Sequence, residues 1–252
     1  MSLRFLGFLL SLGMTLPSFG HNSGEGRVTI EPTAQQALEA GIIHYDFQLF
    51  DTVKNRVLLP SDLAESNTKI LHVIAYDEAR KEFNHVHPTV KGTTWSVQFS
   101  LPKNGTYFIW AQGQLADGTE FSTFSKAIIE GGAPANAITP LGDQRFGSDD
   151  HTLVSLTNNP IHAGQMAMLN FTVSRDDGQA PLMAPYLGAL AHLIAASPDG
   201  DELIHVHPMA GGTPNTGMIH ASFPSEGDYR IWIQFIDRDV LKTIPVSVTV
   251  VK

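Results

Sequence analysis

The sequence of 252 residues contains no cysteine. This absence excludes disulfides, thiolate metal sites, cysteine nucleophiles and a lipid attached to an N-terminal cysteine. Charged residues are also few, at 16% of the chain, and the net charge is −9. Because the acidic chain has no basic clusters either, we expect no binding to nucleic acid or to anionic membrane surfaces.

Long hydrophobic runs are scarce as well. The longest apolar stretch lies near the start, over residues 5–16, and is shorter than the ~20 residues that cross a membrane. Small residues follow it and favour cleavage after Gly20. We therefore predict a signal peptide over residues 1–20, and a periplasmic or secreted protein with no transmembrane segment in its mature chain.

A short pattern, His-x12-His-x-His-Pro, occurs twice and is the strongest functional signal in the chain. The two copies are offset by 120 residues and comprise His72, His85 and His87 in the first, and His192, His205 and His207 in the second. The residues between the first two histidines differ between the copies, at 77–82 and 197–202. Histidines kept at fixed spacing in altered surroundings indicate a binding site.

A second repeated phrase, Gly-x-Tyr-x-Ile-Trp-x-Gln, begins at Gly105 and again at Gly227. Two repeated phrases in the same order indicate an internal duplication. We predict a first repeat over residues 27–130, a Gly- and Pro-rich linker over 131–150, and a second repeat over 151–252.

Each repeat reads as β-structure. Short runs of alternating apolar and polar residues are separated by turn residues at the spacing of a sandwich. The Gly-x-Tyr-x-Ile phrase is typical of the tyrosine corner of immunoglobulin-like domains, at Tyr107 and Tyr229. We predict an all-β chain of two tandem immunoglobulin-like antiparallel β-sandwich domains, with these tyrosines and the neighbouring Trp110 and Trp232 in the cores.

The histidine spacing also predicts a shared face. If the six intervening residues form a hairpin loop, Tyr76 lies opposite Phe83 and Ile74 opposite His85. Strand alternation then places His72, His85 and His87 on one side of the hairpin, and the same counting groups the second trio.

Three neutral imidazoles suit a metal ion. Histidine is the commonest metal ligand, and three histidines with an open fourth position form a known zinc arrangement. We predict copper or zinc as the bound ion. The alternative is that the histidines are structural and bond only to backbone or to one another.

The second repeat has two further candidate ligands. If the strand over residues 218–223 pairs with residues 203–207, Met218 and His220 join the histidine face. A thioether beside imidazoles favours copper, so we expect the second repeat to bind metal more tightly. Otherwise Met218 fills core space, as methionine does readily.

These motifs resemble those of an exported bacterial β-sandwich family, the FixH/YtkA-like family. The likeness is fullest in the second repeat, with His192, the segment His205-Val206-His207-Pro208, residues 223–229 and Trp232. The resemblance implies a protein of the cell envelope, in a family often associated with the handling of heavy metals.

Three function classes compete, of which the third, a metalloenzyme, is not expected because no serine, carboxylate pair or phosphate loop stands out as a catalytic group. The first class is an exported protein that binds or delivers a metal ion. The alternative is a non-catalytic module that docks onto an envelope transporter or another partner. Stoichiometric copper or zinc in the purified protein favours the first class.

Overall fold

The computed structural model describes residues 26–252 apart from 35–36, 66–67 and 158. The predicted signal peptide lies outside the described residues. Within the described part the chain is built of β-strands, with one short 3-10 helix, η1 (Pro60–Asp62), and no α-helix. None of the described helical structure is long and apolar enough to span a bilayer.

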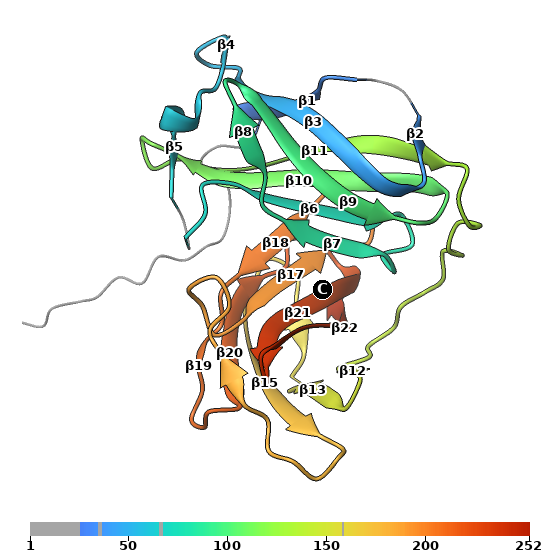
Figure 1. Ribbon diagram of the computed structural model, residues 1–252. Helices are drawn as coiled ribbons and strands as arrows, with labels where there is room; N and C mark the ends of the chain where they lie inside the picture. Colours follow the sequence, from blue (N-terminus) through green and yellow to red (C-terminus); the bar gives the residue numbers. More distant parts are fainter. Residues whose placement is uncertain (1–25, 35–36, 66–67, 158) are drawn as a thin grey trace, which may run out of the picture.

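The first repeat is a sandwich of two β-sheets (Figure 1). We call the sheet turned toward the other repeat the facing sheet, and its partner the outer sheet. The outer sheet has the order β1-β3-β9-β8, with β4 paired to β3, and contains β1 (Val28–Pro32), β3 (Gly41–Asp51), β4 (Arg56–Val57), β8 (Thr89–Lys91) and β9 (Thr94–Leu101). The facing sheet has the order β2-β11-β10-β6-β7, with β5 paired to β10, and contains β2 (Leu38–Glu39), β5 (Leu63–Ala64), β6 (His72–Asp77), β7 (Phe83–Val86), β10 (Gly105–Leu115) and β11 (Glu120–Glu130).

The second repeat has the same architecture. Its outer sheet has the order β12-β13-β15-β20-β19, formed by β12 (Phe146–Asp149), β13 (Thr152–Leu156), β15 (Met166–Arg175), β19 (Met209–Ala210) and β20 (Thr216–Ser222). Its facing sheet has the order β14-β22-β21-β17-β18, with β16 paired to β21, and contains β14 (Ile161–His162), β16 (Met183–Ala184), β17 (His192–Ala196), β18 (Leu203–Val206), β21 (Gly227–Asp237) and β22 (Val240–Val251).

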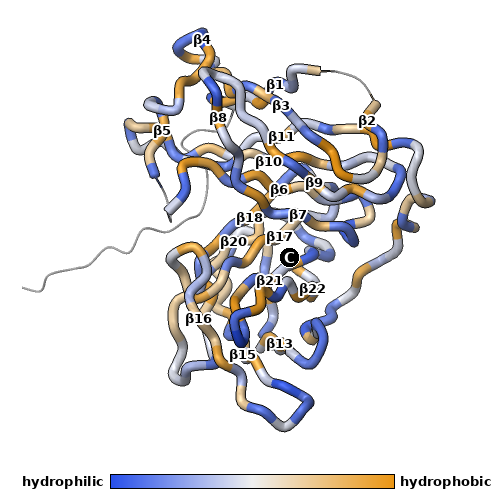
Figure 2. The backbone as a smooth tube through the Cα atoms, in the orientation of Figure 1, coloured by the Kyte–Doolittle hydropathy of each residue, from blue (hydrophilic) through white to orange (hydrophobic). Residues whose placement is uncertain are grey.

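Each repeat has its own hydrophobic core between its two sheets. In β9, for example, Trp95, Val97 and Phe99 are buried while the residues between them are not, because alternate side chains point to opposite faces. In β15, Leu169 and Phe171 are buried in the second core in the same way. Figure 2 shows the hydrophobic residues following the strands of both halves. The predicted fold class, two tandem immunoglobulin-like sandwiches, is confirmed.

The tyrosine corner is present in the second repeat. The buried hydroxyl of Tyr229 accepts a hydrogen bond from the backbone N–H of Ser225, four residues upstream, at 3.2 Å. Tyr107 is buried at the equivalent place in the first core. Both tyrosines are therefore core residues, as predicted.

The segment that joins the repeats is shorter than predicted. Residues 146–149, assigned to the linker over 131–150, form β12 and pair with β13. The second repeat thus begins at Phe146 rather than at His151, because an extended segment can complete the edge of the outer sheet. The rest of the connector runs along one side of the molecule (Figure 1) and is held in part by Ser247, whose Oγ donates to the carbonyl of Gly142 at 2.7 Å.

The two facing sheets pack against each other, so that strands β6 and β17 are buried on both sides. Along β6, Val73 and Ala75 belong to the first core, whereas Ile74 and Tyr76 point the other way. They form an inter-repeat apolar cluster that comprises Ile74, Tyr76, Phe108, Trp110, Ile194, Ala196, Leu203 and Trp232, with Phe83 and Phe124 against it. This cluster acts as a third, smaller hydrophobic core and stabilises the contact between the repeats.

The prediction that Trp110 and Trp232 lie in the repeat cores is wrong. Both are buried, but in the inter-repeat apolar cluster. Each follows an isoleucine that points into its own core, Ile109 or Ile231, and the next side chain along a strand points to the opposite face. The tryptophans therefore stabilise the junction of the repeats instead of the repeats themselves.

Polar contacts also cross the junction. The hydroxyl of Tyr76 accepts from the indole N–H of Trp110 at 3.0 Å and donates to the carbonyl of Gly200, also at 3.0 Å. Nη1 of Arg80 donates to the carbonyls of Ser197 at 3.1 Å and Asp228 at 2.6 Å. The junction thus combines apolar packing with buried groups whose hydrogen bonds fix its register.

Candidate metal centre

Each histidine phrase folds into a hairpin with the predicted register. In the first repeat Tyr76 lies opposite Phe83, and Ile74 lies opposite His85. In the second, Ile194 lies opposite His205. Ile74 and Ile194 both belong to the inter-repeat apolar cluster, so the histidine faces of the two hairpins are turned toward each other.

The two trios consequently meet and form one inter-repeat histidine cluster. The ring centres of His72 and His205 are 5.1 Å apart, and those of His85 and His205 are 5.4 Å apart. His192 also approaches the first repeat, with its ring centre 5.9 Å from that of His85. Sequence counting predicted two separate sites, whereas the structure brings all six side chains to the junction.

Two sets of three imidazoles in this cluster could hold an ion. One consists of His72, His85 and His205, and the other of His192, His205 and His207, and within each set the ligand atoms lie within 4.8 Å of one another. Ligands about 2.0–2.1 Å from a tetrahedral ion are roughly 3.3 Å apart. His72 Nδ1 and His85 Nε2 are already 3.1 Å apart, and His192 Nδ1 and His205 Nε2 are 3.2 Å apart.

The sets have two notable features. His205 belongs to both, so one ion can use either set but two ions cannot each have three ligands. His87 belongs to neither, although its Nε2 lies 3.2 Å from Nδ1 of His72. The first candidate set is therefore completed from the second repeat and not from its own phrase.

Hydrogen bonds outside the sets orient two of the rings. Nδ1–H of His85 donates to Oε1 of Gln234 at 2.7 Å, and the amide of Gln234 is held in turn by Thr243 at 3.0 Å. Nε2–H of His192 donates to the carbonyl of Tyr186 at 2.9 Å. Each bond fixes a tautomer and leaves the lone pair of the other ring nitrogen pointing into the cluster, as in known metal sites.

Burial lowers the pKa of five of these histidines. Together with the neighbouring imidazoles, burial brings the pKa of His85 to about 3 and those of His87 and His207 to about 4. The same two causes hold the pKa of His205 well below its ordinary value, and burial lowers that of His192. These rings are neutral at pH 7, which is the form that binds metal.

A cavity reaches the cluster from the surface. It has a volume of about 510 Å³ and is lined by both repeats, with His72, His205 and His207 among the lining residues. Gln112 also lines it, and Oε1 of this residue is buried without a hydrogen-bond partner in the described part of the chain. An ion or a small ligand therefore has a route to the cluster and an unused acceptor beside it.

Gln112 and Gln234 are functional candidates that sequence reasoning missed. Both end the second repeated phrase, and they lie opposite His72 and His192 in the strand pairing. The duplication of the glutamine at one fixed place was the available signal.

The predicted roles of Met218 and His220 in this cluster are wrong. The assumed pairing of residues 218–223 with 203–207 does not occur, because β20 pairs with β15 and β19 in the outer sheet. Both side chains are exposed on the face of that sheet that points away from the core. The chain crosses from the facing to the outer sheet after His207, which the simple hairpin count could not anticipate.

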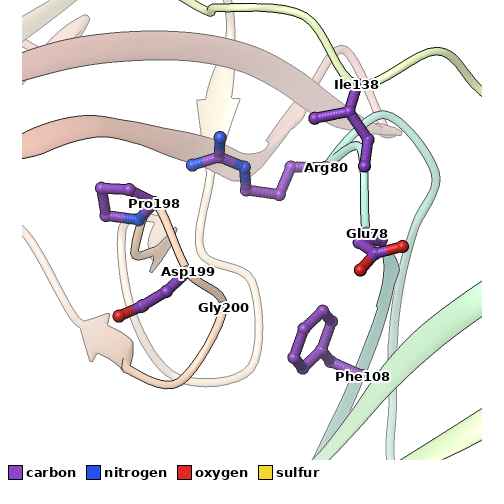
Figure 3. Close-up of a pocket in the computed structure, with 7 residues that line it drawn as sticks. All are labelled: Glu78, Arg80, Phe108, Ile138, Pro198, Asp199 and Gly200. Atoms are coloured by element: carbon purple, nitrogen blue, oxygen red, sulfur yellow. The ribbon is translucent and has the colours of Figure 1, made fainter.

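Among the described residues, those that line a second cavity at the junction, of about 220 Å³, include no comparable set of ligands. Figure 3 shows Arg80 of the first repeat between Ile138 of the connector and the loop formed by residues 198–200. A side chain at Gly200 would collide with the ring of Phe108, at 2.6 Å from its Cβ. This cavity belongs to the packing of the two repeats.

A family model described as Domain of unknown function (DUF8832) matches residues 42–128 and 147–252. The chain belongs to the DUF8832 family. The two matched regions contain both histidine phrases, so the family spans the elements that build the cluster. The match does not address the resemblance to the FixH/YtkA-like family, which stays a prediction. No curated protein matches this DUF8832 chain.

Several solved structures resemble the chain in fold alone. A tetra-tandem repeat from the extending region of a large adhesion protein has 13% identity and a TM-score of 0.29, covering 88% of this chain and 48% of its own. A 1.5-MDa bacterial ice-binding adhesin has 11% identity and a TM-score of 0.25, with 89% and 64% covered. The adhesin InvE of Yersinia pseudotuberculosis has 9% identity and a TM-score of 0.27, with 88% and 58% covered. This chain spans less than two thirds of each.

Proposed function

We propose that this protein is an exported metal-binding protein that holds one copper or zinc ion in the inter-repeat histidine cluster. The observation that carries the proposal is the convergence of six histidines from two distant phrases on one buried place. A purely structural role would not require both repeats to contribute the same three residues to the same junction.

The electrostatics of the cluster support binding of a cation. Six imidazoles packed together could not all be protonated, and burial keeps five of them neutral with lone pairs available. Gln234 and the carbonyl of Tyr186 supply the outer hydrogen bonds that metal-ligating histidines commonly make.

The donor set narrows the choice of ion. The candidate ligands are all imidazole nitrogens, and the chain has no thiolate to offer. Imidazole suits copper and zinc, whereas magnesium and calcium prefer carboxylate and carbonyl oxygens. A three-histidine site with access to a cavity leaves a further coordination position for water or for a ligand that exchanges the ion.

Metal titration of the full chain tests the proposal. Calorimetry with Cu²⁺ and Zn²⁺ at pH 7.5 should give one tightly bound equivalent, and X-ray absorption of the loaded protein should show about three imidazole nitrogens at 2.0–2.1 Å. A protein that binds neither ion, or whose bound ion has mainly oxygen ligands, would refute it.

A further inference from the structure

The solvent face of the outer sheet of the second repeat is unusually rich in methionine. Met166 and Met168 on β15 are 52% and 65% exposed, and Met209 on β19 and Met218 on β20 are each 37% exposed. They are four of the five methionines in the described part of the chain. Large apolar side chains gathered in the open on one face mark a place of interaction rather than a packing role.

Strand pairing brings these side chains and one histidine together. Met168 lies directly opposite His220, and Met209 directly opposite Met218. Met218 and His220 are two residues apart on β20, so they project from the same face. Directly paired residues have Cβ atoms about 4.5–5.5 Å apart, and diagonal neighbours remain within reach of long side chains. Thioether arms at these positions can meet the imidazole of His220 at a common point.

The chemistry of this face is soft and uncharged. Residues 166–172 of β15 and β20 (Thr216–Ser222) contain no acidic or basic residue other than histidine. Hard cations have no carboxylate to bind there. Thioether sulfur is a soft ligand that selects Cu(I) among the first-row metals, and imidazole accompanies it well.

The first repeat does not repeat this arrangement. On its outer sheet His44 lies opposite Gln98, and Asp46 lies opposite Ser96, at the places that correspond to the methionine face. The solvent face of the outer sheet is therefore polar in the first repeat, although the fold of the two repeats is the same. The methionines of the second repeat are not a requirement of the sandwich.

We propose that Met168, Met218 and His220, with Met209 beside them, form a surface site for Cu(I). The site is distinct from the inter-repeat histidine cluster because the outer and facing sheets of the second repeat lie on opposite sides of its core. It does not depend on metal binding by that cluster. The flexibility of methionine lets the thioethers close around an ion that arrives from solution.

A competition titration on the full chain tests this site. Cu(I) would be supplied under anaerobic, reducing conditions with bicinchoninate as the competing chelator, and the His205→Ala variant would provide a background in which the histidine cluster is impaired. That variant should still bind one equivalent of Cu(I), and X-ray absorption should show sulfur ligands. The double variant Met168→Leu/Met218→Leu should then bind Cu(I) at least about tenfold more weakly. Mutation of a residue that only hydrogen-bonds to a metal ligand already lowers metal affinity by about 10–100-fold.

Matched variants separate a site from a general effect. Met183→Leu replaces the one described methionine that lies outside this face, on β16, and should leave the affinity for Cu(I) unchanged. Leucine has nearly the volume of methionine, so the double variant should keep its fold, and His220→Asn offers an independent removal of one ligand. Unchanged affinity in both the double variant and His220→Asn, or a Cu(I) spectrum without sulfur, would overturn the proposal. Failure of Cu²⁺ and Zn²⁺ to bind the cluster would leave this result untouched.

Discussion

Replacing His205 by alanine is the sharpest test of a shared centre, because this residue belongs to both candidate ligand sets. Its removal leaves His72 with His85 on one side and His192 with His207 on the other, so no set of three remains. Loss of an outer hydrogen-bond partner already costs about 10–100-fold in metal affinity. Removing a ligand from both sets should therefore weaken binding by more than about 100-fold, or roughly 2.7 kcal/mol.

The control for this variant is His87→Ala. His87 has the same chemistry and lies in the same cluster, yet it is absent from both sets. We expect its replacement to change the affinity for Zn²⁺ by no more than about threefold, well under 1 kcal/mol. His72→Ala should fall between the two, because it disables one set and leaves the other whole.

The assay is calorimetric titration of each full-length variant with Zn²⁺ and Cu²⁺, after thermal unfolding has shown that the metal-free variants keep a cooperative transition. Equal losses for His205→Ala and His87→Ala would mean that each phrase supplies its own site. Unchanged binding in His205→Ala would contradict the shared centre altogether.

Three further predictions concern the metal-free protein. Its free energy of unfolding should be greatest above pH 6.5 and fall as the pH drops toward 4, because His85 in the unfolded chain takes up a proton that folded His85, with its pKa lowered to about 3, does not. The slope from this group approaches about 1.4 kcal/mol per pH unit. A free energy of unfolding in urea that stays constant between pH 7.5 and 5 would contradict this prediction. Trp232→Ala should cost about 3–5 kcal/mol in the same assay, since it empties the inter-repeat apolar cluster, and a loss below about 1 kcal/mol would show that the junction is loosely packed. Tyr229→Phe should cost about 0.5–1.5 kcal/mol because the backbone N–H of Ser225 loses its acceptor, and no measurable change would mean that water replaces the hydroxyl.

Local pairing could be predicted from the sequence because it depends on residues close together in the chain. The six-residue loop and strand alternation were enough to place Ile74 opposite His85, and the Gly-x-Tyr-x-Ile phrase was enough to indicate the tyrosine corner at Tyr229. Where a strand leaves one sheet for the other, this reasoning fails. Met218 was assigned to the wrong neighbour because the crossover after His207 follows from the closure of the whole sandwich.

The junction of the repeats could not be placed by periodicity alone. Alternation shows which side chains share a face, but not what covers that face. A signal was nevertheless present in the sequence, where residues 73–76 form an unbroken apolar run after His72, because a strand that is apolar on both sides needs a partner on both sides. Ile74 and Trp110, which lie on the face turned away from the first core, therefore indicate a partner sheet, and that sheet brings the two trios together.

The inter-repeat histidine cluster is built from two halves of one chain, and this determines how it responds to dilution of the protein. Equivalent residues from the two halves come together at the junction in the manner of a symmetric dimer: His72 lies beside His192, and Trp110 and Trp232 belong to one apolar cluster. In a dimer of separate chains such a centre would come apart as the protein is diluted. The connector over residues 131–145 makes the encounter intramolecular, with an effective concentration set by its length. Dilution alone therefore does not separate the two halves of the cluster, although their hydrogen bonds already differ, as those of Gln112 and Gln234 do.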